Sequence, residues 1–265
     1  MLNISVIIPL HEIKDKTLEL FDKAVESILV NDENTDNVKL RAKVICPETI
    51  SETLKKRSKK RYDVLINNGC TDYCSQINEA VKQIDTDYFA ILEYDDVFMP
   101  KYFKGFYDYY TVNKDVSLFL PINVLVDSET NIREFLNEIV WAKDFSKVRG
   151  YIDYDCLQSF NGFNLTGGIF NKNDFIAVGG YKPSIQVAFN YELLLRLVHK
   201  LYKVYVVPKE GYVHTLNAVD SLTDIYTKTM TDNDIKGWFN LAKCECAYTE
   251  DRCKTPVNHT VNELK

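Results

Sequence analysis

Short apolar runs alternate with segments of helical periodicity through the first hundred residues. The runs are rich in β-branched residues and lie at 4–9, 39–46, 62–66 and 88–92. They are stopped by Pro or Asn-Gly signals, or by an acidic cluster, which is typical of buried strands. Apolar residues recur at helical spacing across 18–29, and shorter helical patterns follow the second and third runs. This alternation predicts a doubly wound, mostly parallel central sheet flanked by helices, in the α/β class.

The second half of the chain is less regular. We expect helices over 101–112, near 131–145 and around 191–198, strands over 116–122 and 203–208, and an apolar stretch at 165–170. No internal repeat and no Gly/Ser linker divides the chain. The pattern therefore predicts one domain over 1–230, a C-terminal helix over 231–253 packed on it, and a flexible tail over 254–265.

Composition narrows the class of protein. With 46 % apolar and 26 % charged residues among 265, the chain can bury a sizeable core. The net charge of −6 argues against a protein whose whole surface binds a polyanion. There is no apolar run of 18 residues and no signal-peptide pattern, and the seven cysteines are an odd number. These features predict a protein of the cytoplasm without a transmembrane segment.

Polar residues follow the predicted strands at the point where each strand ends. They are Pro9-Leu10-His11-Glu12, Asn67-Asn68-Gly69 and Glu93-Tyr94-Asp95-Asp96. Because ligands of such sheets bind at the carboxyl ends of the strands, we expect these residues to form the site.

The acidic cluster at 93–96 carries the strongest chemical signal. Three carboxylates in four positions repel one another, and a bound divalent cation would neutralise them. Mn²⁺ or Mg²⁺ prefers one or two carboxylates together with phosphate oxygens of the substrate, which suits a diphosphate-linked donor. The alternative is a solvated acidic turn in which an Asp caps the next helix.

Four segments in order resemble glycosyltransferase family 2, which has the GT-A fold. They are SVIIP at 5–9, NGCTDYCSQINEA at 68–80, ILEYDDVFMP at 91–100, and GGIF followed by GGY within 167–181. The third resembles the metal-binding DXD signature of the family. Compact members without membrane anchors are common in bacteria and in large tailed bacteriophages, and the chain resembles the bacteriophage members. A viral member would act in the host cytoplasm.

The resemblance implies roles for individual residues. It implies a donor-binding half at about 1–100 and an acceptor half at about 101–230. Donor contacts are expected from Pro9, His11, Glu12, Glu48, Asn68, Asn78, Glu93 and Tyr94. The resemblance also implies that Asp95 and His214 ligate Mn²⁺ or Mg²⁺, and that Asp96 supports the acidic turn or touches hydroxyls of the donor sugar.

The catalytic base departs from the family pattern. An inverting transferase needs a carboxylate that takes the proton of the acceptor hydroxyl. The acidic dipeptide of the family falls on Phe189-Asn190, and an amide cannot accept that proton. We therefore predict Glu192 as the base. The alternative is a structural Glu in the first turn of a helix, favoured there by the helix dipole.

The sequence thus predicts a metal-dependent transferase that moves a sugar from a nucleotide-diphosphate donor to an acceptor hydroxyl, with inversion. Glycan, protein and modified-DNA acceptors remain open. The basic run at 55–61 is typical of a solvated helix end, but it leaves a DNA-modifying enzyme open as an alternative. That alternative predicts a basic groove beside the donor pocket, lined by this run. A second alternative is a non-catalytic binding protein that keeps the fold without the base.

Overall fold

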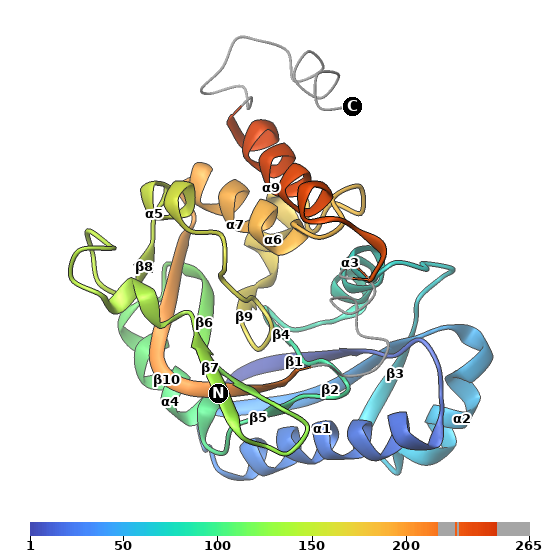
Figure 1. The fold of residues 1–265 in the computed structure, drawn as a ribbon. Helices are drawn as coiled ribbons and strands as arrows, with labels where there is room; N and C mark the ends of the chain where they lie inside the picture. The colour runs from blue at the N-terminus through green and yellow to red at the C-terminus, as the bar shows by residue number, and fades with distance from the viewer. Residues whose placement is uncertain (217–225, 227, 248–265) are drawn as a thin grey trace.

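The structure is a computed structural model that describes residues 1–216, 226 and 228–247. Within these residues one sheet holds ten strands in the order β3-β2-β1-β4-β9-β6-β10-β5, with β7 beside β6 and β8 beside β10 (Figure 1). The strands are β1 (Leu2–Pro9), β2 (Val38–Cys46), β3 (Tyr62–Ile66), β4 (Tyr88–Ile91), β5 (Val97–Phe98), β6 (Val116–Val126), β7 (Ile132–Leu136), β8 (Tyr151–Ile152), β9 (Ile169–Asn171) and β10 (Lys203–Thr215).

Helices cover both faces of this sheet. On one side, α1 (Asp15–Glu33), α2 (Glu48–Ser58) and α4 (Tyr102–Val112) pack beneath it in the view of Figure 1. The opposite face carries α3 (Tyr73–Gln83), α5 (Tyr154–Ser159), α6 (Lys172–Ala177), α7 (Phe189–His199) and α9 (Asp232–Ala247). The short 3₁₀ helix η1 (Glu138–Trp141) follows β7. The predicted α/β class and doubly wound arrangement are confirmed.

Side-chain alternation along the central strands explains the two layers. In β1, Ile7 faces the α3 side, whereas Ile4, Val6 and Ile8 face the α1 side, and all four are fully buried. A strand with both faces buried reads as a continuous apolar run, which is the pattern at 4–9. No helix among the described residues is long and apolar enough to cross a membrane.

The strand directions fix where a ligand can bind. Strands β3, β2, β1 and β4 are parallel, as are β6 and β10, while β9 lies antiparallel between β4 and β6. The parallel strands end together at one edge, where Pro9, Ile66 and Ile91 lie. Because β9 runs the other way, the residues that precede it reach the same edge.

The helix predicted near 131–145 is wrong. The structure has β7 there, paired antiparallel with β6, followed by η1. Asn137 adopts a positive φ of 74° between the two elements and donates through its amide to the carbonyl of Pro121, 2.9 Å away. The left-handed residue stops the strand, so the apolar positions of this segment divide between a strand and one short turn of helix.

The basic run does not lie beside the cavity described below. Residues 55–61 end α2 and lead into the start of β3, at the edge of the sheet opposite the carboxyl ends of the strands. Arg57 and Arg61 both pair with Asp22 of α1, and Lys55 pairs with Glu52. The predicted basic groove beside the donor pocket is therefore not formed by this run.

Candidate active site

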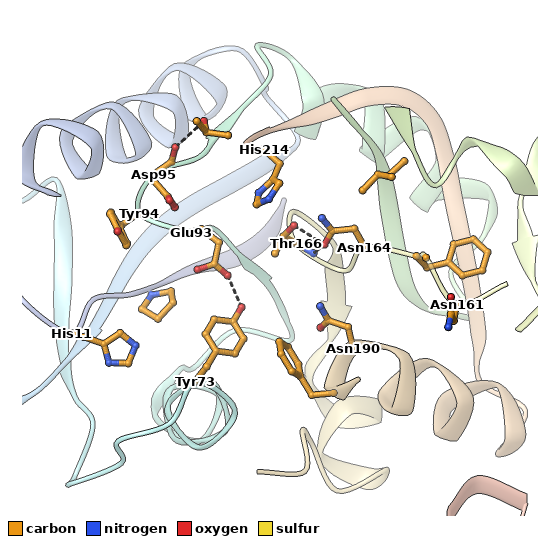
Figure 2. Close-up of a pocket in the computed structure, with 16 residues that line it drawn as sticks. His11, Tyr73, Glu93, Tyr94, Asp95, Asn161, Asn164, Thr166, Asn190 and His214 are labelled. Carbon is orange, nitrogen blue, oxygen red and sulfur yellow. Dashed lines mark hydrogen bonds between the residues drawn. The ribbon is translucent and has the colours of Figure 1, made fainter. Parts of the chain in front are cut away.

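A cavity of about 520 Å³ opens at the carboxyl edge of the parallel strands (Figure 2). Its lining residues are Pro9, His11, Tyr73, Glu93, Tyr94, Asp95, Leu136, Asn161, Gly162, Phe163, Asn164, Thr166, Phe189, Asn190, His214 and Thr215. They come from the ends of β1, β7 and β10, the turn after β4, the starts of α3 and α7, and the segment before β9. The fold thus joins residues more than 200 positions apart in sequence.

The acidic turn after β4 supplies the carboxylates of the cavity. Glu93 accepts a hydrogen bond of 2.6 Å from the Tyr73 hydroxyl, and the Glu93 backbone N–H donates to the Tyr212 hydroxyl. Burial raises the pKa of Glu93 to about 8; the hydrogen bond from Tyr73 opposes this shift, and the charges of Asp95 and Asp96 add to it. Burial and the charge of Asp96 also raise the pKa of Asp95 to about 6. Acidic side chains are therefore crowded in this turn, and two of them hold their protons more tightly than a free carboxyl does.

Asp96 lies behind the cavity rather than in its lining. It is 1 % exposed and accepts hydrogen bonds of 2.8 Å from the Tyr212 hydroxyl and from the backbone N–H of Thr215. It also bonds to Nδ1 of His214 at 2.8 Å. Burial alone would lower the pKa of His214, but the bond and charge of Asp96 raise it. Asp96 thereby orients the imidazole and leaves Nε2 as the ring nitrogen available to the cavity.

Three of the predicted donor contacts besides Glu93 line the cavity: Pro9, His11 and Tyr94. The Gln76 amide donates to Nδ1 of His11 at 2.9 Å, and burial lowers the pKa of this histidine. A neutral His11 then carries its proton on Nε2 and offers a donor without charge.

The other four predicted donor contacts are not in the cavity lining. Glu12 pairs with Lys14, and Glu48 is exposed at the first turn of α2. Asn68 is exposed too and donates to Glu79. Asn78 bonds to both the N–H and the carbonyl of Tyr181, so it ties α3 to the turn at 179–181.

Glu192 is not brought into the cavity. Its side chain is 1 % exposed, and its two oxygens accept from Nε and Nη2 of Arg196 at 2.9 and 2.6 Å. Lys182 lies 3.0 Å from Glu192 and also pairs with Glu245 of α9. Residues two positions apart on a helix point about 200° apart, so Asn190 faces the cavity while Glu192 faces the core. The predicted base is a buried ion-pair partner.

Sequence reasoning missed the segment before β9. Asn161, Asn164 and Thr166 line the cavity, yet they follow no parallel strand. The available signal was their position directly before the Gly167-Gly168 turn and an apolar strand. It could be used only with knowledge that β9 is antiparallel, because only then does its beginning lie at the ligand edge.

Comparisons with known proteins define first the fold and then the family. The structure of S. aureus TarS 1–349 in complex with UDP-GlcNAc superposes with a TM-score of 0.62 at 12 % identity, covering 99 % of this chain and 70 % of that one. The mannosyltransferase PcManGT from Pyrobaculum calidifontis, in complex with GDP-Man and Mn²⁺, gives 0.63 at 11 % identity, covering 98 % and 69 %. This chain therefore has the GT-A fold.

The family model for glycosyl transferase family 2 matches residues 5–166, which is more than half of the chain. The chain belongs to this family and is a glycosyltransferase, as the motifs predicted. Among curated proteins, none matches the sequence.

The residues present fit a divalent cation whose ligands come partly from the protein and partly from a substrate. No group of three or more His, Cys, Asp or Glu side chains in the described part of the chain is arranged to hold a metal by itself. Asp95 and His214 nevertheless line the same cavity, and Asp96 fixes the imidazole. Two protein ligands completed by phosphate oxygens are a common way to bind Mg²⁺ or Mn²⁺.

Proposed function

We propose that the protein is a metal-dependent glycosyltransferase that moves a sugar from a nucleoside-diphosphate sugar to an acceptor hydroxyl. One observation carries this proposal: the acidic turn at 93–96 and His214 meet in a cavity at the carboxyl edge of a family 2 fold. Burial and the neighbouring carboxylates raise the pKa values of Glu93 and Asp95, and a bound cation would stabilise the charged form of both groups.

Asp95 and Nε2 of His214 would hold Mn²⁺ or Mg²⁺. When bound, the cation balances the charge that develops on the departing diphosphate. Asp96 has a positioning role in this proposal, because it fixes the ring of His214 and the backbone of Thr215 without entering the cavity. Metal-bound histidines are commonly oriented by such a carboxylate on the other ring nitrogen.

The donor would extend from the cation toward the end of β1. Pro9 and His11 line the cavity there, and Figure 2 shows Tyr94 between His11 and Asp95. Tyr73 holds the Glu93 carboxyl at 2.6 Å, so Glu93 can meet donor hydroxyls in a fixed orientation. Neutral His11 and Tyr94 suit the uncharged parts of a nucleotide, whereas the diphosphate needs the cation.

The proposal is tested by release of nucleoside diphosphate from UDP- and GDP-sugars. We expect one donor to be turned over with Mn²⁺ and the rate to fall to background in EDTA. Asp95→Asn should lower the rate at least a hundredfold, while the matched variant Asp108→Asn, at an exposed position on α4, should leave it unchanged. Equal rates for wild type and Asp95→Asn would contradict the proposal, and donor binding without turnover would favour the non-catalytic binding protein.

A further inference from the structure

The cavity has two chemically different halves. Every ionisable side chain in its lining belongs to one half: His11, Tyr73, Glu93, Tyr94, Asp95 and His214. The other half holds Asn161, Asn164, Thr166 and Asn190 together with Phe163 and Phe189. We call these six residues the amide wall. Figure 2 shows the three asparagines across the cavity from His11, Tyr94 and Asp95. The cation and donor account for the ionisable half and leave the amide wall without a role.

Hydrogen bonds within the protein orient two of these amides toward the cavity. Oδ1 of Asn164 accepts from the backbone N–H of Thr166 at 2.9 Å, and from the hydroxyl of the same residue at 2.7 Å. Oδ1 of Asn190 accepts from the buried Tyr181 hydroxyl at 3.0 Å. The acceptor oxygens are thus engaged, whereas neither amide NH₂ group has a hydrogen-bond partner among the residues that the structure describes. These groups remain as donors at the cavity surface.

The wall is also held rigidly. Asn137, 2 % exposed, donates to the Asn164 carbonyl and accepts from the Asn164 N–H, both at 2.9 Å. Fully buried Asn123 donates to the Thr166 carbonyl at 3.1 Å. Two buried amides, one in β6 and one directly after β7, therefore anchor the 164–166 segment. A site organised before binding loses less entropy when its ligand arrives.

Aromatic rings complete the surface. Phe163 is 5 % exposed and packs against Phe160, with ring centroids 5.0 Å apart. Phe189 lies between Tyr73 and Tyr181, with ring centroids 5.5 and 5.6 Å away. Uncharged hydrogen-bond donors beside aromatic rings match a sugar, whose hydroxyls accept hydrogen bonds and whose C–H faces are apolar.

We propose that the amide wall is the acceptor subsite and that it binds an uncharged carbohydrate. This inference rests on the proposed glycosyltransferase function and names the acceptor class for it. No lysine or arginine of the described chain lines the cavity, so a phosphorylated, carboxylated or nucleic-acid acceptor would find no cation on the wall. The acidic side chains Glu93 and Asp95 lie in the same cavity and offer an anionic acceptor no favourable contact.

Saccharide binding tests the proposal without turnover. The probes are neutral gluco-, manno- and N-acetylglucosamine trisaccharides, their phosphorylated or uronate counterparts, and a duplex containing 5-hydroxymethylcytosine. Titration calorimetry and ligand-observed NMR would be run on the full chain with Mn²⁺, with and without UDP or GDP. We expect a neutral trisaccharide to bind at least tenfold more tightly than its anionic counterpart and than the duplex.

Variants locate the binding on the wall. Asn164→Ala and Asn190→Ala should each lower the affinity for the neutral trisaccharide about three- to tenfold, as expected for the loss of one hydrogen bond. Both should leave the Mn²⁺-dependent affinity for the nucleotide sugar within twofold. Asn173→Ala, at an exposed position on α6, is the matched control and should change neither. Because Asn161 is exposed, Asn161→Lys should preserve folding and bring the anionic counterpart at least a tenfold gain in affinity.

Three results would overturn the proposal. The first is tighter binding of an anionic probe or of the duplex than of every neutral trisaccharide, and the second is no neutral binding at millimolar concentration. The third is an equal loss of nucleotide-sugar affinity in the wall variants, which would assign the wall to the donor. If the wild type binds no nucleotide-sugar donor, the proposed function is refuted instead. The affinity for the saccharides is measured independently and would still test the acceptor subsite.

Discussion

Replacing Glu93 by Gln should stabilise the protein without metal while it damages the site. Glu93 shares one turn with Asp95 and Asp96, and its pKa is raised from the ordinary 4.5 to about 8. Unfolding frees the carboxyl from burial and from its acidic neighbours. The folded state therefore binds this proton more tightly than the unfolded state does, and stability falls as the pH rises from 4.5 toward 8, then levels off.

The size of the effect follows from the pKa. At about 1.4 kcal/mol for each pH unit, the rise corresponds to about 5 kcal/mol above pH 8, which is an upper limit. Glutamine keeps a partner for the Tyr73 hydroxyl but carries no charge, so Glu93→Gln removes this cost. If the variant regains about half of this free energy, its melting temperature should rise by about 5–10 °C at pH 9, given roughly 2–4 °C per kcal/mol for a chain of this size.

Thermal unfolding in EDTA from pH 5 to pH 9 measures this difference. The melting temperatures of wild type and Glu93→Gln should nearly coincide at pH 5 and separate progressively up to pH 8. Glu19→Gln, at an exposed position on α1, is the control and should follow the wild type throughout. A gap that is constant across the pH range, or a variant less stable at pH 9, would refute the reasoning. With Mn²⁺ and donor, Glu93→Gln should turn over at least tenfold more slowly.

Single substitutions at three other places should change metal binding, stability and turnover. Asp96→Asn should weaken Mn²⁺ binding about 10- to 100-fold, and ¹⁵N NMR of the metal-free protein should show an altered tautomer of His214; unchanged spectra would contradict the positioning role. Leu194→Ala, at a fully buried position, should lower the free energy of unfolding in urea by about 2–5 kcal/mol. The exposed Leu201→Ala control should change it by less than about 0.5 kcal/mol, and equal losses would contradict the assigned core. Asn190→Asp puts a carboxylate on the amide wall and should raise kcat about tenfold or more with a new pH dependence, whereas an unchanged kcat would place the reacting hydroxyl elsewhere.

The central strands and the acidic turn were predictable because their signals are local. A strand buried on both faces must be apolar at nearly every position, as in β1, and the polar residues after it must lie at the carboxyl edge. The run 93–96 was informative for the same reason, since three neighbouring carboxylates are costly unless something binds them. These arguments need no knowledge of the partners that residues find across the fold.

The remaining parts of the site depend on distant partners. Glu192 is a carboxylate near the expected position of the base, which made it the natural candidate. In the structure it forms salt bridges with Arg196, one helical turn later, and with Lys182 from another segment. The amide wall required the antiparallel direction of β9, which sequence periodicity does not encode. Likewise, β7 formed where helical spacing was expected because pairing with β6 outweighed local propensity.

The most direct test of the account is anomalous diffraction from crystals soaked with Mn²⁺ and UDP or GDP. We expect a manganese peak bounded by the Asp95 carboxylate and Nε2 of His214, with its remaining ligands from the diphosphate and water. A bound nucleotide with no peak at that position, or a peak held by other side chains, would contradict it.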